Sequence, residues 1–547
     1  MNKFIFVTGG VVSGLGKGIT VASIGLILKS NGITVDAVKF DPYLNVDPGT
    51  MSPFEHGEVF VLNDGSECDL DLGHYERFLD IDLTSNSSVT AGKIYSAILD
   101  MERKGDFLGK NVQLIPNVTN YIKDCFERGK DSDVRIIEIG GSAGDMEGEI
   151  FLEAIRQFGQ NHKGQVLHIH LGYVPFLKCS GEYKTKPFQS SLRELQRIGL
   201  RPDVLVARYE PQLNQTLTAE HLDKLALFGN VDQDNVIPVP DLDSIYAVPK
   251  HFVQSGFLPV LSNFVGQVLQ ANLPEFFEQK GKIDDPLKKI KVALVGKYGS
   301  KLGDADYSVM QSLTIAAFAA KVIIQPLTIA ADDLLDQGNQ SYQDLLQADC
   351  VIILGGFGRR GMEGKIIAAN IARTTQKPFL GICLGLQMAV IEFARNVCEL
   401  SDAISAEMLE FEEYKESKSV LIDFMAGQKE LVAVGGQKGG TMRLGAYSCH
   451  LERDTLAYRL FGQEEIVERH RHRLEVQAEF VPILESKGMI VSGKYYYNES
   501  NFLPEIIELK KSLHPYFIAI QSHPEMLSRP SKPHPLFLGL LKACLDF

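Results

Sequence analysis

The sequence has few of the features that mark secreted, zinc-binding and membrane proteins. Its 8 cysteines are scattered through 547 residues, and no two of them form a Cys-x-x-Cys pair. This spacing predicts neither a disulfide framework nor a structural zinc site. No apolar run approaches the length that crosses a bilayer, and the N-terminal residues lead into a strand and a glycine loop rather than a signal peptide. We therefore expect a cytoplasmic protein with no membrane partner.

Positive charge is also scarce. The chain has 55 lysines and arginines against 69 aspartates and glutamates, which gives a formal net charge of −14. Such an acidic chain excludes general binding to nucleic acids, so anionic ligands must be held by local basic clusters. The hydrophobic share of 45% and the charged share of 23% are typical of a globular protein with an ample core.

The order of apolar runs predicts two α/β domains. Residues 1–267 alternate strand-like runs with helical stretches, which is typical of a doubly wound, mostly parallel sheet. Residues 268–290 are polar and charged, and we interpret them as a linker. A new strand at 291–296 opens a second α/β domain that spans 291–547. The sequence contains no internal repeat and no low-complexity tract.

Gly381-Ile-Cys-Leu-Gly385 is the most informative motif. A strand-like run, Lys377–Ile382, enters it, and a helical run, Gln387–Arg395, leaves it. This is the pattern of a nucleophile elbow with cysteine in the serine position. Glycines permit the sharp turn, and the following helix N-terminus favours the thiolate of Cys383. A buried structural cysteine between glycines is the alternative.

Gln521-Ser-His-Pro-Glu525 could supply the partners of Cys383. It follows a strand-like run, Tyr516–Ile520. His523 could serve as the base, and Glu525, two residues along an extended segment, could orient the imidazole. A solvated loop histidine is the alternative interpretation.

A glycine turn, Leu354-Gly-Gly-Phe-Gly358, follows the apolar run Cys350–Ile353. Backbone N–H groups in such a turn suit an oxyanion hole, for which Gly355, Gly356 and Leu384 are candidates. An ordinary glycine-rich turn is the alternative.

The N-terminal region contains a second glycine-rich loop. Strand Phe4–Val7 leads into Thr8–Gly18, and a helical run over residues 19–29 follows. The backbone N–H groups and Lys17 of such a P-loop-like segment are expected to bind phosphates. The loop is longer than a Walker A loop, and Gly18 stands where a magnesium-binding Ser or Thr would be.

Magnesium must therefore find carboxylates elsewhere. Asp71, and Glu138 at the end of a strand, are the candidates, because ligands gather beyond the carboxyl ends of parallel strands. A salt-bridge role is the alternative for each acid. Lys39, Lys184 and Lys186 are candidates for binding a triphosphate, with surface solvation as the alternative.

Four strings resemble the CTP synthase family closely. They are Lys39-Phe-Asp-Pro-Tyr through Phe60, Asp69-Leu-Asp-Leu-Gly-His, Glu182-Tyr-Lys-Thr-Lys-Pro and Glu468-Arg-His-Arg-His-Arg. The similarity covers nearly the whole chain. It implies an amidoligase domain fused to a class I glutamine amidotransferase domain. Such an enzyme converts UTP to CTP with ATP and glutamine, through a phosphorylated UTP, and completes de novo CTP synthesis.

The resemblance also implies roles for individual residues. The catalytic triad would be Cys383, His523 and Glu525, and the metal ligands Asp71 and Glu138. Lys17 and Lys39 would act at the transferring phosphoryl group. ATP would be bound by Gly14, Leu15, Gly16, Lys17, Gly18, Ile19 and Asp71. UTP, or CTP as feedback inhibitor, would be bound by Ser13, Asp145, Met146, Glu147, Lys184, Thr185, Lys186, Pro187, Phe188, Gln189 and Lys224. Glutamine would be bound by Gly356, Leu384, Gly385, Leu386, Gln387, Glu407 and Arg473.

The family further implies Mg²⁺ with ATP, GTP as an allosteric activator, and a homotetramer that can assemble into filaments. Ammonia is mostly protonated at neutral pH, so a dry passage between the domains is expected. Ser142, Ala143, Ser522 and Met526 depart from the usual family pattern, and residues 409–435 match it poorly. Two alternatives are a corrinoid-acid amidase with a related ligase domain and a filament-forming scaffold with a decayed site.

Overall fold

The computed structural model describes residues 3–51, 57–212, 215–283, 286–297, 306–409, 419–424, 442–498 and 501–546. The chain divides into two compact units. The first contains Met1–Pro48 and Cys68–Lys282, and the second contains Gly49–Glu67 and Ile283–Phe547. A short segment from the N-terminal part of the chain therefore belongs to the second unit. Among the described residues, no helix is long and apolar enough to cross a membrane.

A seven-stranded sheet forms the centre of the first unit, in the order β11-β10-β7-β1-β6-β2-β5. Every neighbouring pair in it is parallel. Its strands are β1 (Lys3–Gly9), β2 (Val35–Asp41), β5 (Ser88–Thr90), β6 (Val134–Ile139), β7 (Val166–Tyr173), β10 (Val204–Tyr209) and β11 (Val236–Pro240). The prediction of a doubly wound parallel sheet is confirmed for this unit.

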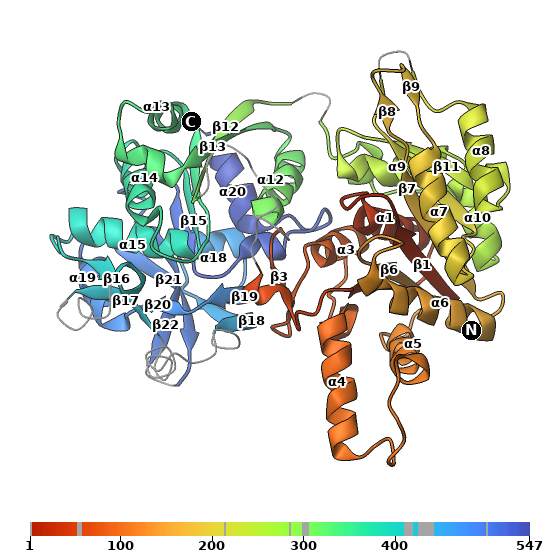
Figure 1. Ribbon diagram of the computed structural model, residues 1–547. Helices are drawn as coiled ribbons and strands as arrows, with labels where there is room; N and C mark the ends of the chain where they lie inside the picture. Colours follow the sequence, from red (N-terminus) through yellow and green to blue (C-terminus); the bar gives the residue numbers. More distant parts are fainter. Residues whose placement is uncertain are drawn as a thin grey trace. The chain divides into compact units, whose positions relative to one another are not determined.

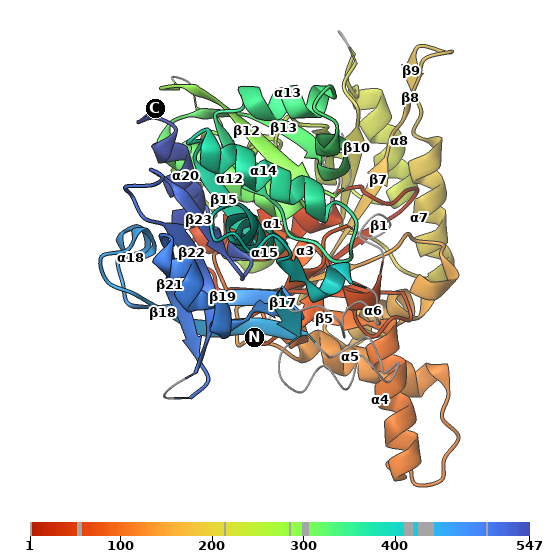
Figure 2. The same ribbon diagram turned by 90° about the vertical axis from the view of Figure 1, so that its left-hand side faces the viewer.

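Helices cover this sheet, and one of them extends beyond it. In both views α4 extends away from the sheet with α5 beside its base (Figure 1, Figure 2). The helices of the unit are α1 (Lys17–Ser30), α3 (Asp71–Leu79), α4 (Ala91–Lys104), α5 (Thr119–Glu127), α6 (Glu149–Asn161), α7 (Lys186–Ile198), α8 (Ala219–Gly229), α9 (Val248–Gln254), α10 (Phe257–Val265) and α11 (Glu275–Glu278). Short strands β8 (Phe176–Leu177) and β9 (Glu182–Tyr183) pair as a hairpin before α7.

The second unit contains a nine-stranded mixed sheet, in the order β13-β12-β14-β15-β23-β22-β21-β18-β19. The strands from β13 to β23 pair in parallel, and those from β23 to β19 pair antiparallel. Its strands are β12 (Lys289–Gly296), β13 (Ile323–Ala330), β14 (Cys350–Ile353), β15 (Phe379–Ile382), β18 (Arg443–Leu451), β19 (Glu465–His472), β21 (Met489–Tyr496), β22 (Phe502–Leu509) and β23 (Phe517–Ile520). A small sheet joins β16 (Ile404–Ser405), β17 (Val420–Phe424) and β20 (Leu474–Val476).

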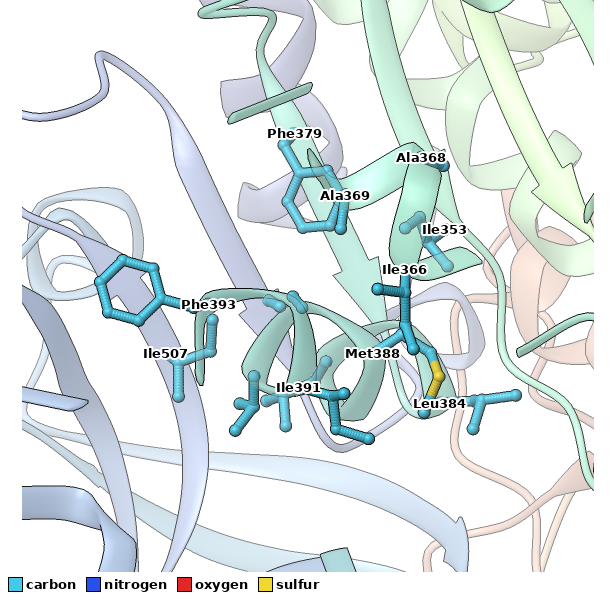
Figure 3. Packing of buried hydrophobic residues seen from close by; sticks show 14 of the residues in the cluster. Ile353, Ile366, Ala368, Ala369, Phe379, Leu384, Met388, Ile391, Phe393 and Ile507 are labelled. Atoms are coloured by element: carbon cyan, nitrogen blue, oxygen red, sulfur yellow. The ribbon is translucent and has the colours of Figure 1, made fainter. Parts of the chain in front are cut away.

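Two apolar clusters lie on opposite faces of this sheet, because alternate side chains of a strand point to opposite sides. Ile352 belongs to one cluster and its neighbour Ile353 to the other. Figure 3 shows the cluster that holds Ile353, where Met388 of α15 lies beside Ile366 of α14. The helices of the unit are α12 (Tyr307–Ala320), α13 (Gln340–Gln347), α14 (Met362–Thr374), α15 (Leu384–Asn396), α18 (Leu456–Phe461), α19 (Val481–Ser486) and α20 (Pro535–Ala543). This packing fixes α15 directly behind the predicted nucleophile.

Candidate active site

Cys383 lies at a strained turn between a strand and a helix. β15 ends at Ile382, α15 begins at Leu384, and Cys383 between them has φ 53° and ψ −105°. A non-glycine residue rarely adopts such a positive φ, and conformations of this kind cluster at functional sites. A Cβ atom at Gly381 would lie 2.8 Å from the Cβ of Ala519, and one at Gly385 would lie 2.3 Å from the carbonyl oxygen of Ile353. Both glycines are therefore required by close approach of neighbouring backbone and side chains.

His523 and Glu525 form a buried pair next to this turn. Nδ1 of His523 lies 2.7 Å from Oε1 of Glu525. Burial alone would lower the pKa of His523, but the negative charges of Glu525 and of the Cys383 thiolate raise it well above its ordinary value. Because Nδ1 is bound to the carboxylate, Nε2 is the nitrogen available to exchange a proton with the thiol. The predicted triad residues are thus brought together in one unit.

The glycine turn after β14 lies beside these residues. A Cβ atom at Gly355 would be 3.2 Å from Cε1 of His523 and 3.7 Å from the Cβ of Cys383. Gly356 has φ +142°, which favours glycine. In the described part of the chain, the N–H groups of Gly355 and Gly356 donate to no acceptor. They are free to bind a developing negative charge.

A cavity of about 360 Å³ opens beside His523 and the glycine turn, and every residue that lines it belongs to the second unit. Its walls include His523, Glu525, Arg473 and Arg471, with the ring of Phe357 5.0 Å from the Arg471 guanidinium carbon. Two arginines at the wall suit a ligand that carries a carboxylate. A cavity of this size is in the range of small-molecule sites.

In the first unit, the glycine loop after β1 closes around Lys17. The Lys17 ammonium donates to the carbonyl oxygen of Gly141 at 2.8 Å, and burial lowers its pKa. A Cβ atom at Gly18 would lie 1.9 Å from Oδ1 of Asp71. Glycine is therefore required at position 18, where a Walker A loop has Ser or Thr, because the Asp71 carboxylate occupies the space of such a side chain.

Acidic side chains crowd around Lys39 in the same region. Its ammonium binds Asp71 directly and lies 2.8 Å from Oδ1 of Asp69 and 3.7 Å from Oδ1 of Asp41. Burial alone would lower the pKa of Lys39, but these carboxylates raise it well above its ordinary value. Burial also raises the pKa of Asp41 to about 7. The region holds more negative charge than its lysines neutralise.

Glu138 is the other predicted metal ligand, and it lies within electrostatic range of Asp71. Burial and the Asp71 charge raise the pKa of Glu138 to about 8, and the hydroxyl of Tyr75 donates to its carboxylate. A divalent cation beside Glu138 would offset the neighbouring negative charge that opposes its ionisation. Within the described ranges, no group of three or more His, Cys, Asp or Glu side chains is arranged for a metal. A magnesium ion here would need ligands from its nucleotide or from water.

Apart from Ser13 in the loop after β1, the residues predicted to bind a pyrimidine nucleotide form three groups. Asp145 precedes a short helical turn (Met146–Gly148), and its carboxylate accepts from the N–H of Ser142 at 3.0 Å. The second group flanks the start of α7, where Lys184 pairs with Glu182. Lys224 lies on α8 and pairs with Glu220 at 2.7 Å. In the part of the chain that the structure describes, no hydrogen bond or ion pair joins the three groups.

Comparison with known proteins accounts for both halves of the chain. Residues 3–266 match the family model for the CTP synthase N-terminus, and residues 304–543 match that for glutamine amidotransferase class-I. The chain is 47% identical over 557 residues to a CTP synthase of Methanocaldococcus jannaschii, with 99% of this chain and 98% of that protein covered. The chain belongs to the CTP synthase family. A CTP synthase of Moorella thermoacetica is 48% identical over 550 residues, with 99% and 98% covered.

Among solved structures, the glutaminase domain of Trypanosoma brucei CTPS with bound acivicin aligns with this chain at a TM-score of 0.42 and 32% identity. That alignment covers 47% of this chain and 94% of the other. The two family models and the full-length CTP synthase relatives confirm the family resemblance of the motif strings, and the corrinoid-acid amidase alternative is set aside.

The side-chain amide of Gln521 contacts the sulfur of Cys383, and the CTP synthase motifs did not predict this contact. Nε2 of Gln521 donates to Sγ of Cys383 at 3.7 Å, and Oε1 of Gln521 accepts from Gln387 at 3.2 Å. Gln387 thereby sets which end of the Gln521 amide faces the thiol. The sequence feature that could have predicted this contact is the position of Gln521, two residues before His523. An extended chain places two such side chains on one face.

The segment Gly49–Glu67 also contributes to the glutaminase unit of this CTP synthase. Arg469 binds Oδ1 of Asn63 at 2.6 Å, and Arg471 binds Oε1 of Glu67 at 2.8 Å. Glu58 accepts from the N–H of Ser308 at the start of α12. The Arg-His-Arg-His-Arg alternation placed arginines on one side of β19, but nothing in the local sequence identified their partners.

One departure from the CTP synthase pattern has a measurable consequence. Ser522 is 0% exposed, and among the described residues its hydroxyl has no hydrogen-bond partner. A buried unpaired hydroxyl costs about 1 kcal/mol or more. Ser522→Ala is therefore expected to raise the free energy of unfolding by about 1 kcal/mol in urea titrations. Ser448→Ala, at an exposed position of β18, should change it little; a less stable Ser522→Ala protein would contradict this account.

Proposed function

We propose that the two units perform successive halves of one reaction, in which the second releases ammonia from glutamine and the first transfers it to UTP. As a CTP synthase, the protein is a glutamine-hydrolysing ligase that converts UTP to CTP at the expense of ATP. The arrangement of Cys383 beside the His523–Glu525 pair carries this assignment of roles. We assign the amidoligase domain to 1–267, the linker to 268–290 and the amidotransferase domain to 291–547. Within the first of these ranges, Gly49–Glu67 belongs to the second unit.

In the glutaminase half, the thiolate of Cys383 attacks the amide carbon of glutamine. The new S–C bond moves the carbonyl electron pair onto oxygen, which the N–H groups of Gly355, Gly356 and Leu384 stabilise. His523 gives its proton to the leaving nitrogen, ammonia departs, and water then hydrolyses the thioester. The charged state of His523, which Glu525 supports, fits this donation. We assign the glutamine carboxylate and amino groups to Arg473 and Glu407, with Leu384–Gln387 beneath the substrate.

In the synthase half, the C4 oxygen of UTP is a poor leaving group until it is phosphorylated by ATP. We assign Lys17 and Lys39 to the transferring phosphoryl group, because two ammonium groups would offset the charge that builds up there. Ammonia then attacks C4 and inorganic phosphate leaves. The loop Ser13–Ile19 is assigned to nucleotide contacts, and the Asp145–Glu147, Lys184–Gln189 and Lys224 groups to the pyrimidine nucleotide.

We assign Mg²⁺ to Asp71 and Glu138, whose mutual repulsion fits a divalent cation. When bound, the ion would neutralise phosphate charge on ATP. Asp71→Asn is expected to raise the Mg²⁺ concentration for half-maximal ammonia-dependent synthesis by at least about tenfold, because one charged ligand is lost. Glutamine hydrolysis should not change.

A magnesium titration of CTP formation from added ammonia measures this effect. Asp100→Asn, at an exposed position of α4, is the matched control and should leave the magnesium curve in place. An Asp71→Asn curve that overlaps the wild-type curve would remove Asp71 from the metal site.

The proposed function also includes regulation by nucleotides and assembly into an oligomer. GTP is assigned as an allosteric activator of glutamine hydrolysis and CTP as a feedback inhibitor at the pyrimidine-nucleotide residues. The working form is proposed to be a homotetramer that can stack into filaments. The 8 free cysteines support a reducing compartment, which for this protein we take to be the cytoplasm.

A single coupled assay tests the function. The protein is incubated with UTP, ATP, Mg²⁺ and glutamine, with and without GTP, and both CTP and glutamate are measured. We expect CTP and glutamate in equal amounts, and faster formation of both with GTP. Glutamate without CTP would leave only a glutaminase, and neither product would favour the scaffold with a decayed site.

A further inference from the structure

Two lysine side chains donate hydrogen bonds to main-chain carbonyl groups of the glycine turn after β14. Lys365 on α14 donates to the carbonyl oxygen of Leu354 and, at 2.9 Å, to that of Gly355. Lys297, which follows β12, donates to the carbonyl oxygens of Phe357 and Gly358. Four carbonyl groups of one short turn therefore face ammonium groups.

Lys365 is unusual because a charged side chain is completely enclosed. It is 0% exposed, and no described carboxylate lies within ion-pair distance of its ammonium. Enclosing an unpaired charge is costly, so such groups mark sites where the charge has a function. The partners of this charge are main-chain carbonyl groups of the turn next to Cys383.

The geometry of the peptide unit links these carbonyl groups to the oxyanion hole. In a trans peptide the C=O and the following N–H point in opposite directions. Among the described residues, the peptides of this turn are trans. The Leu354 carbonyl shares a peptide with the N–H of Gly355, and the Gly355 carbonyl shares one with the N–H of Gly356. Binding both oxygens therefore turns both N–H groups away from Lys365.

We propose that Lys365 is a positioning residue for glutamine hydrolysis, which locks the Leu354–Gly356 backbone with its N–H groups in the oxyanion-binding orientation. The inference rests on the roles assigned above to Cys383 and the turn. Lys365 does not touch the substrate in this account. It acts on the oxyanion only through the two peptide groups, which its charge also polarises.

The variant Lys365→Met keeps the length of the side chain and removes the ammonium. We expect the kcat of glutamine hydrolysis to fall on the order of 10²-fold, with KM changed by less than about threefold, because the turn matters most when the oxyanion forms. Alkylation of Cys383 by iodoacetamide should keep its wild-type rate, because displacement at a saturated carbon forms no oxyanion.

Lys377→Met is the matched control. Lys377 also donates to a main-chain carbonyl, that of Ala348, but it lies before β15, at the end of the strand opposite Cys383. Hydrolysis and alkylation should both stay at wild-type rates in this variant. A Lys365→Met enzyme with wild-type kcat, or one whose alkylation falls in parallel with kcat, would overturn the proposal.

A pH profile of the wild-type enzyme tests the same inference without a variant. Burial, together with Lys297, lowers the pKa of Lys365 to about 7, against the opposing charges of Asp306, Cys383 and Glu407. The ammonium is lost as pH rises through that value, so kcat for hydrolysis should decline on the alkaline side while alkylation does not. A kcat that keeps rising with alkylation would contradict the proposal.

The outcomes separate this inference from the assignment of the nucleophile. If Cys383→Ala still hydrolyses glutamine, the proposed function of the second unit fails. If Cys383→Ala is inactive and Lys365→Met is fully active, only the role of Lys365 fails.

Discussion

Replacing Cys383 with alanine is expected to abolish CTP formation from glutamine and to leave CTP formation from added ammonia. Loss of the nucleophile removes the covalent route, so glutamine hydrolysis should fall on the order of 10⁴-fold or more. The loop, lysines and acids assigned to synthesis all belong to the first unit, and Cys383 belongs to the second. The measurement is CTP production with each nitrogen source at saturating ATP and UTP.

Cys398→Ala is the matched control for this substitution. Cys398 is also buried in the second unit, and its thiol donates to the carbonyl oxygen of Ile483. Both nitrogen sources should support normal rates in this variant. A Cys383→Ala protein that cannot use ammonia would show that the two units do not divide the reaction as proposed.

Replacing Lys17 with alanine is expected to have the opposite pattern. CTP formation should fall on the order of 10²-fold or more with either nitrogen source, because a charge that stabilises phosphoryl transfer is lost. Basal glutamine hydrolysis, measured as glutamate without nucleotides, should persist. Lys17 is half-buried, and the charges of Glu138, Lys39 and Asp71 all act on its ammonium.

Lys29→Ala controls for a loss of charge on the same helix. Lys29 lies in the last turn of α1 and donates to the carbonyl oxygens of Leu79 and Asp80. The Lys29→Ala protein should retain CTP synthesis with both nitrogen sources. Unchanged ammonia-dependent turnover in Lys17→Ala would remove Lys17 from the phosphate site.

Local sequence was sufficient for much of the fold and of the triad. Alternating apolar runs predicted the parallel sheet, because buried parallel strands need apolar side chains on both faces. The strand, glycines and helix around Cys383 predicted a turn that the structure has with φ 53°. His523 and Glu525 could be paired because they lie two residues apart on one segment.

Other contributors could not be predicted, because their partners are remote in the chain. Lys365 occupies an ordinary position in a helical run, and only the fold brings it behind Leu354 and Gly355. Arg471 lies more than 400 residues from Glu67, which it binds. Asp69 joins Lys39 only when the segment before α3 folds against β2. Such contacts depend on tertiary packing, which has no short-range sequence signal.

The central claim is that the amide nitrogen of glutamine, released at Cys383, becomes the amino group of CTP. The most direct measurement supplies glutamine labelled with a heavy nitrogen isotope in its amide, together with ATP, UTP and Mg²⁺, and analyses the product by mass spectrometry. The account predicts CTP that carries the label, and no labelled CTP from the Cys383→Ala protein. Unlabelled CTP, or labelled ammonia with UTP left unchanged, would contradict it.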